Sequence, residues 1–202
     1  MKKFLHVGCG PAKKADTVAG FNTDDWQEIR FDIDPSCKPD IVGTIVDMSA
    51  VADKSVDAIY SSHNIEHVFA HEVGQVLSEF KRVLTDDGFV VLTCPDLQSV
   101  CEVVAADKLL EPIYQSPAGP VAPLDVLYGL RSSIAAGKHY MAHKCGFTFS
   151  VLCKLFLDSG FKGVYGGRRP RDFDLWIVAL KAAKSESEMA AFARAYLPQQ
   201  AG

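Results

Sequence analysis

The residues best suited to chemistry begin at Gly8-Cys9-Gly10, directly after the apolar run of residues 3–7. Glycines at the end of a buried strand let the backbone turn sharply and approach a nucleoside or amino-acid ligand closely. Asp32 closes the next apolar segment, near the ~20-residue spacing at which a carboxylate accepts hydrogen bonds from ribose hydroxyls. Together these residues predict a nucleoside-binding site, although tight strand ends without a ligand use glycines as well.

This glycine-rich stretch departs from the full dinucleotide-binding pattern. Lys13 stands where that pattern has its third glycine, and the segment before the second strand is short and interrupted by Gly20 and Asn22. We therefore expect no long helix that carries a pyrophosphate on its N-terminus. A ligand with adenosine but no pyrophosphate fits these residues better, and a nicotinamide-dependent oxidoreductase remains the nearest enzyme alternative.

Two further carboxylates follow predicted strands. Asp47 ends the third strand, where it could accept an adenine amino group or could instead cap a helix. Asp34 lies on the same alternating face as Asp32, and an Asp-Pro pair more often begins a turn than contacts a ligand.

Histidine suits proton transfer near neutral pH, and it is needed here if the substrate must lose a proton. The candidate catalytic residues are His63, His139, Tyr140 and His143. The last three fall within one short segment of the chain.

The stretch His63-Asn64-Ile65-Glu66-His67 matches the H-x-x-E-H pattern of a zinc-hydrolase family. In that pattern His63 and His67 would bind zinc and Glu66 would activate water, which requires these residues to lie inside a helix and a third ligand to come from elsewhere in the chain. His63 directly follows a predicted strand, so we expect no metal and keep zinc hydrolysis only as a remote alternative.

Apolar patterns place these residues on alternating strands and helices. Strands are predicted over residues 3–7, 28–32, 40–46, 56–61, 89–93, 161–165 and 175–181, with amphipathic helices over 73–84 and 148–159. Strands joined by helices or short crossovers form a parallel sheet. We therefore expect an α/β, Rossmann-like, doubly wound and mostly parallel seven-stranded sheet, whose ligands bind beyond the carboxyl ends of the strands.

Residues 97–146 interrupt this pattern with two apolar-periodic segments around a Pro/Gly-rich stretch. Because about 50 residues cannot bury a core alone, we expect a helical lid inserted into one domain of residues 1–183. Residues 184–202 are predicted to form a polar helical tail.

Composition narrows the setting in which this domain works. The 202-residue chain has a net charge of −4, which argues against nucleic acid because phosphate binding needs a basic surface. No stretch approaches the ~18 apolar residues of a membrane helix, and His6 breaks the first apolar run too early for a secretion signal. The six cysteines contain no Cys-x-x-Cys pair, as is typical of reduced thiols. We expect a cytoplasmic protein with no membrane partner.

Several segments together resemble the class I S-adenosylmethionine-dependent methyltransferases, and more narrowly a compact bacterial group of predicted methyltransferases. These segments are LHVGCG, RFDIDP, VDAIYSSHNIEH, LSEFKRVLTDDGFVVLTCPD, AHKCGFTFSVLCKLFLDSGF and DLWIVALK, between residues 3 and 182. The resemblance implies S-adenosylmethionine as the cofactor, in-line methyl transfer to a small-molecule acceptor and S-adenosylhomocysteine as the product. A non-catalytic protein that binds the same cofactor is a further alternative.

The resemblance also implies a set of cofactor-binding residues. They are Gly8, Gly10, Asp32, Asp47, Met48, Ser62 and His63. The glycines match the loop beneath the methionine part of the cofactor, Asp32 matches the ribose contact, and Asp47 with Met48 matches the adenine contact. Ser62 and His63 lie beside the amino-acid group. Two positions depart from the family, which often has a third glycine at position 12 and an aspartate at position 44.

Overall fold

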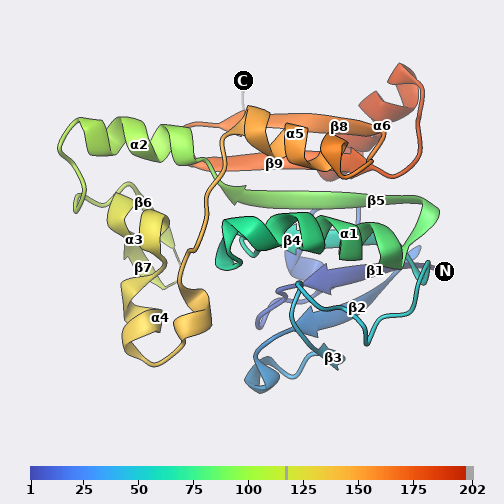
Figure 1. The fold of residues 1–202 in the computed structure, drawn as a ribbon, viewed down its shortest axis with the longest axis horizontal. Coiled ribbons are helices and arrows are strands. Elements are labelled where there is room, and N and C mark those ends of the chain that lie inside the picture. The colour runs from blue at the N-terminus through green and yellow to red at the C-terminus, as the bar shows by residue number, and fades with distance from the viewer. Residues whose placement is uncertain (117, 199–202) are drawn as a thin grey trace.

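A seven-stranded sheet forms the centre of the computed structural model, which describes residues 1–116 and 118–198 (Figure 1). Its strands are β1 Lys2–Val7, β2 Trp26–Asp32, β3 Ile41–Val42, β4 Val56–Ser62, β5 Leu84–Pro95, β8 Gly163–Arg169 and β9 Asp174–Leu180. They lie in the order β3-β2-β1-β4-β5-β9-β8. Strands β1 to β5 are parallel to one another, and β9 is antiparallel to both β5 and β8. The predicted mostly parallel, seven-stranded sheet is confirmed.

The inner strands are mainly apolar in their central stretches because both faces of the sheet are covered. In β5 the run from Phe89 to Leu92 is buried, and it pairs with the equally buried run from Ala58 to Ser61 of β4.

The third strand is shorter than the predicted range of residues 40–46. Gly43 packs so closely on the Phe31 ring that a Cβ at this position would lie 2.6 Å from Phe31 Cζ. After Gly43 the chain turns, and the Asp47 amide donates to the Thr44 carbonyl at 3.0 Å. This early turn brings residues 43–46 to the carboxyl end of β2.

Six helices accompany the sheet in the described part of the chain. They are α1 Val73–Val83, α2 Leu97–Ala105, α3 Pro123–Tyr128, α4 Arg131–Ala135, α5 Phe149–Asp158 and α6 Glu186–Tyr196. On one face, α1 and α5 pack on the largest apolar cluster, and α1 buries Val76, Leu77 and Phe80 at helical spacing as predicted. None of the helices in the described ranges has the length and apolar character that a bilayer crossing requires.

The opposite face lacks a helix between β1 and β2, because the intervening residues 8–25 form only the short 3-10 turn Lys14–Asp16. Phe21 fills this place and stacks on Phe4, with ring centroids 4.5 Å apart. Helix α6 covers the rest of the face with Met189, Phe192 and Tyr196. Residues 186–196 form a helix, as expected for this segment, and its three apolar side chains at helical spacing pack on the sheet, which a polar tail would not do. The last four residues of that predicted tail, 199–202, lie outside the described residues.

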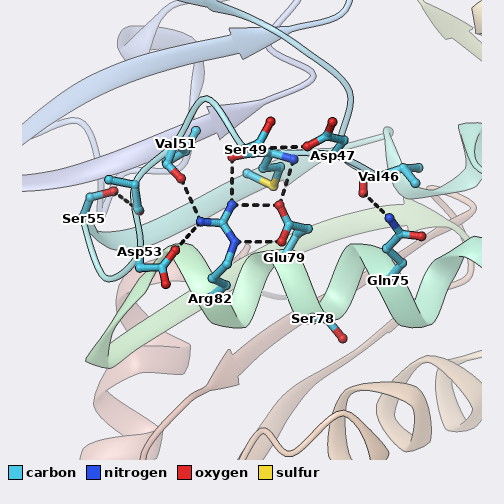
Figure 2. Close-up of polar contacts among 12 residues, drawn as sticks. Val46, Asp47, Ser49, Val51, Asp53, Ser55, Gln75, Ser78, Glu79 and Arg82 are labelled. Atoms are coloured by element: carbon cyan, nitrogen blue, oxygen red, sulfur yellow. Dashed lines mark hydrogen bonds and ion pairs between the residues drawn. The ribbon is translucent and has the colours of Figure 1, made fainter.

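Helix α1 also anchors the loop that follows β3 (Figure 2). Arg82 donates from Nε to Glu79 Oε1 at 2.8 Å and from Nη2 to the Met48 carbonyl at 2.8 Å. Glu79 Oε2 accepts from the Met48 amide at 2.8 Å, and Gln75 Nε2 donates to the Val46 carbonyl at 2.9 Å. These bonds hold residues 43–48 against the sheet.

Residues 97–146 project beyond the carboxyl ends of the strands as helices α2, α3 and α4 with the small hairpin β6 Tyr114–Ser116 and β7 Gly119–Val121 (Figure 1). The start of this insertion is held by Asp96, which is fully buried. Its carboxylate accepts hydrogen bonds from Arg168 Nε at 2.8 Å and from Ser99 Oγ at 2.6 Å. The predicted apolar segment 123–135 divides at Gly129, whose φ of 96° separates α3 from α4.

Candidate functional site

A cavity of about 550 Å³ opens beyond the carboxyl ends of β1, β2 and β4. Its walls come from the loop after β1, the end of β2, residues 43–46, the turn after β4 and the segment between α4 and residue 144. This volume falls within the ~300–1,000 Å³ of small-molecule sites, and the location agrees with the rule for parallel sheets.

Asp32 and Gly10 form the best-defined polar part of this cavity. Asp32 is 7% exposed, and its Oδ2 accepts from the Gly10 amide at 2.7 Å while its Oδ1 accepts from the Asp34 amide at 2.8 Å. An ionised carboxylate has about four lone-pair positions, so two remain for ligand hydroxyls. Gly10 has a φ of 50°, and a Cβ there would meet no heavy atom within 4 Å. The loop therefore forms an open cradle beside a fixed carboxylate.

Asn64 is a lining residue that the sequence analysis missed. Gly8 approaches it so closely that a Cβ on Gly8 would lie 2.5 Å from Asn64 Cγ. Asn64 Nδ2 is shielded from solvent and has no hydrogen-bond partner within residues 1–116 and 118–198. His63 holds the turn with a φ of 48° and donates its amide to the Thr93 carbonyl at 2.9 Å. A free buried donor in the cavity wall fits a ligand with an acceptor group, such as a carboxylate.

Three predicted contacts lie outside the residues that line the cavity: Asp47, Met48 and Ser62. Met48 is fully buried and its amide is bound by Glu79, whereas Asp47 is exposed and accepts from the Ser49 amide at 3.0 Å. The nearby wall is instead formed by residues 43–46, because β3 ends earlier than predicted. Gly8, Gly10, Asp32 and His63 do line the cavity.

Tyr140 lies in the cavity wall and binds the far strand end. Its hydroxyl donates to Asp34 Oδ2 at 2.6 Å, and Lys138 Nζ lies 3.4 Å from the same oxygen. Hydrogen bonds from Ser36 and then Tyr140 hold the pKa of Asp34 well below its usual range. The bond to Asp34 raises the pKa of Tyr140, so this hydroxyl keeps its proton at neutral pH. His139 is exposed and lies outside the lining residues.

A cluster of histidines around Glu66 lies between this cavity and a smaller one of about 200 Å³. Glu66, on the 3-10 turn Ile65–His67, and His143 line the smaller cavity, whereas His67 lines the larger one. The His67 and His143 rings are 4.9 Å apart at 72°. His63 Nδ1 lies 3.5 Å from Glu66 Oε1. The structure thus groups two of the predicted histidines, His63 and His143, with a glutamate and a histidine that were not among the predicted catalytic residues.

The charges in this group are coupled. Burial would raise the pKa of Glu66, but the neighbouring imidazoles outweigh burial and lower it, so the side chain is a carboxylate at neutral pH. Burial lowers the pKa of His143 despite the nearby carboxylate, which keeps that ring neutral. Packing around His63 disfavours its charge, but the negative charge of Glu66, whose Oε1 lies 3.5 Å from Nδ1, outweighs the packing and raises the pKa of His63. The group therefore offers one anion and at least one neutral imidazole.

Comparison with known proteins relates this arrangement to one enzyme class. Residues 5–92 match the family described as "Methyltransferase domain", a segment that contains the glycine loop and the Glu66 turn. No curated relative matches the chain.

Solved structures with the same fold include an S-adenosylmethionine-dependent methyltransferase from Methanosarcina mazei, with a TM-score of 0.59, 16% identity, and coverage of 90% of this chain and 93% of that one. A protein from Pyrococcus horikoshii has a TM-score of 0.57 and 14% identity, with 88% and 81% coverage. A Burkholderia thailandensis N-methyltransferase, solved with 1,6-didemethyltoxoflavin and S-adenosylhomocysteine, has a TM-score of 0.56 and 14% identity, with 90% and 71% coverage. The solved structures confirm the fold expected from the resemblance, and the match over residues 5–92 agrees with the expected family.

Proposed function

We propose that this chain, a class I S-adenosylmethionine-dependent methyltransferase by family match and fold, methylates a small-molecule acceptor. The observation that carries the proposal is Asp32, whose buried carboxylate is fixed by two backbone amides beside a glycine cradle at the end of β1. This arrangement supports a ribose contact and needs no pyrophosphate-binding helix, in keeping with the short crossover of residues 8–25.

The residues of the larger cavity divide the binding of S-adenosylmethionine among them. Gly8 and Gly10 would lie under the methionine part, Asp32 would accept from the ribose, residues 43–46 would contact the adenine, and Asn64 would donate to the amino-acid carboxylate; all of these residues line the cavity. Of the cofactor contacts predicted from the sequence, Gly8, Gly10, Asp32 and His63 belong to this proposed binding site. When bound, the cofactor supplies a methyl group already activated on a sulfonium.

The protein then contributes mainly position. Holding the acceptor in line with the bond to be broken supplies much of the rate. The acceptor's lone pair forms the new bond to the methyl carbon as the carbon–sulfur bond breaks, and the electron pair of that bond stays on sulfur. An acceptor that carries a proton must lose it, and His143 and His63 are the candidate bases beside the cavity.

Residues 97–146 act as a lid and as the acceptor-binding part of a domain spanning residues 1–183. Tyr140 supports this role because it reaches from the insertion to Asp34 across the cavity. Tyr140 is therefore a positioning residue here. The six cysteines are free thiols, which supports the cytoplasm as the place of action.

Calorimetric titration with S-adenosylhomocysteine tests this function. We expect binding to the native chain, and an affinity about 10- to 100-fold lower for Asp32→Asn because a charge-assisted hydrogen bond is lost. Asp57→Asn is the matched control, since Asp57 accepts from the Lys3 amide at 2.8 Å at the opposite end of β1. Absence of binding at millimolar ligand, or equal affinities of Asp32→Asn and the native chain, would contradict the proposal.

A further inference from the structure

Glu66 is the least satisfied carboxylate among the described residues. Its side chain is 1% exposed, and neither Oε1 nor Oε2 has a hydrogen-bond partner in the described ranges. The basic group that forms an ion pair with it is the His63 imidazole, whose Nδ1 lies 3.5 Å from Glu66 Oε1. An ionised carboxylate in a protein interior costs several kcal/mol unless a partner or a metal offsets its charge. The environment of Glu66 is therefore incomplete without a further positive group.

Two imidazoles beside Glu66 are oriented by the backbone. His67 Nδ1 donates to the Ala142 carbonyl at 3.2 Å, and His143 Nδ1 donates to the Val126 carbonyl at 2.7 Å. A carbonyl oxygen accepts but cannot donate, so Nδ1 carries the proton in each ring and Nε2 keeps its lone pair. Metal-binding histidines are held in this way, with one ring nitrogen bound to a backbone carbonyl and the other free for the metal.

A backbone hydrogen bond also joins the two segments of the chain that carry these side chains. The Lys144 amide donates to the Glu66 carbonyl at 2.8 Å, so the segment that carries His143 is bound directly to the turn that carries Glu66. Helix packing is not needed to bring the three side chains together.

We propose that Glu66, His67 and His143 bind one divalent transition-metal ion, for which Zn²⁺ is the first candidate. One ligand atom from each residue lies within 4.8 Å of the other two. A tetrahedral zinc site with bonds of ~2.0–2.2 Å has ligand atoms ~3.4 Å apart, so small side-chain rotations would close the group around the ion. Two imidazoles and one glutamate form a known catalytic zinc set that leaves a fourth position open.

These ligands differ from those implied by the H-x-x-E-H pattern. His67 and Glu66 belong to that pattern, but the third ligand is His143 from the inserted segment, whereas His63 stays outside the group of three. Metal binding would therefore join the insertion to the Rossmann-like core at the boundary between the two cavities.

The location indicates what the ion does, and this step rests on the proposed methyltransferase function. His67 lines the larger cavity while Glu66 and His143 line the smaller one, so an ion held by them would lie at the boundary between the two cavities and could contact an acceptor bound in the larger one. A bound metal lowers the pKa of a hydroxyl that coordinates it. The acceptor would then be an alcohol, phenol or enol that releases its proton to solvent on coordination. Its oxygen would form the bond to the methyl carbon while the carbon–sulfur bond breaks, and His143 would act as a metal ligand and not as the base.

Metal titration of the chelator-treated protein tests the site independently of turnover. We expect one Zn²⁺ per chain by calorimetry, and a visible Co²⁺ absorption typical of a site with nitrogen and oxygen ligands. Glu66→Gln and His143→Ala should each weaken Zn²⁺ binding by at least about 100-fold, since loss of a direct ligand exceeds the 10- to 100-fold cost of losing its supporting partner. His71→Ala is the matched control, because His71 is an exposed histidine on the next turn outside the group.

Each variant is also titrated with S-adenosylhomocysteine, which reports whether the larger cavity is intact. The metal site is refuted if the native chain binds that ligand but no stoichiometric metal, or if Glu66→Gln and His143→Ala bind Zn²⁺ as tightly as His71→Ala. If Zn²⁺ binds one to one and depends on Glu66 and His143 while S-adenosylhomocysteine does not bind, the metal site stands and the proposed function fails.

Discussion

Two buried carboxylates at the carboxyl ends of the strands have opposite environments. Asp32 receives two backbone amides, so its charge is already stabilised and its spare lone pairs can serve a neutral hydroxyl. Glu66 has no hydrogen bond within the described residues, and it lies among imidazoles. At the residue scale this difference separates the proposed nucleoside contact from the proposed metal ligand, although both side chains are acidic and both lie at the ends of strands.

The sequence predicts Asp32 as a ligand contact, whereas it indicates Glu66 only as part of the H-x-x-E-H pattern and does not predict its contact with His143. Asp32 follows a strand at a spacing that a ribose contact requires, so its role depends on local order alone. His143 meets Glu66 only because the inserted segment returns to the strand ends, and Asn64 meets Gly8 only because His63 adopts a φ of 48°. A contact that depends on a distant segment, or on one unusual backbone angle, cannot be predicted from the periodicity of apolar residues in the sequence.

The two glycines of the first loop should respond differently to the same substitution. Gly8→Ala places a Cβ against Asn64 as well as imposing a left-handed φ of 63°, so we expect a loss of stability of about 2–4 kcal/mol. Gly10→Ala imposes only the φ of 50°, at a cost of about 1–2 kcal/mol, but its methyl group enters the cavity.

Urea unfolding and calorimetry with S-adenosylhomocysteine separate the two effects. Gly10→Ala should lower affinity more than stability, while Gly8→Ala should lower both. Equal unfolding midpoints for the two variants would show that the close approach between Gly8 and Asn64 has no energetic weight.

At the scale of elements, the ends of strands decide which residues enter the site. Because β3 stops at Val42, residues 43–46 replace Asp47 and Met48 as the cavity wall. Apolar periodicity predicts that a strand exists there, but it does not locate the turn, which depends on Gly43 meeting the Phe31 ring. Asp47, the predicted adenine contact, therefore follows the residues that form the cavity wall and is not part of it.

Helix α1 holds this wall through Glu79 and Arg82, and the link should be visible in the pH dependence of stability (Figure 2). The hydrogen bond from Arg82, followed by that from the Met48 amide, lowers the pKa of Glu79 in the folded chain. A lowered folded pKa means that the unfolded chain binds the proton more tightly. The stabilisation is thus complete above the unfolded value of about 4.3 and is lost as the pH falls through the folded value.

Glu79→Gln removes this contribution. We expect it to reduce the free energy of unfolding by about 1–2 kcal/mol at pH 7, and the difference from the native chain should shrink below about pH 4. Asp86→Asn is the control, because Asp86 is 74% exposed and solvent screens its pair with Lys54, so this substitution should change stability much less than Glu79→Gln does. A difference between Glu79→Gln and the native chain that grows on acidification would contradict the assignment.

At the scale of the whole molecule, the short first crossover has a structural consequence. A parallel sheet needs cover on both faces, and residues 8–25 supply only Phe21 and its neighbours on one of them. Helix α6 completes that cover from the other end of the chain. In the sequence, Met189, Phe192 and Tyr196 stand at the spacing of one helix face. The charged residues between them are more typical of an exposed tail.

If α6 is part of the core, its apolar side chains should matter for stability and not for the site. Phe192 packs edge-on against Phe89, with ring centroids 4.9 Å apart, on the face opposite α1. We expect Phe192→Ala to lower the free energy of unfolding by about 2–4 kcal/mol, because it leaves a cavity beside the sheet, while affinity for S-adenosylhomocysteine stays unchanged.

Leu157→Ala on α5 is the control, since Leu157 is 49% exposed and its substitution should cost less than about 1 kcal/mol of stability. Equal urea midpoints for Phe192→Ala and Leu157→Ala would mean that α6 only rests on the surface, whereas a loss of ligand affinity in Phe192→Ala would mean that this face of the sheet also shapes the strand ends.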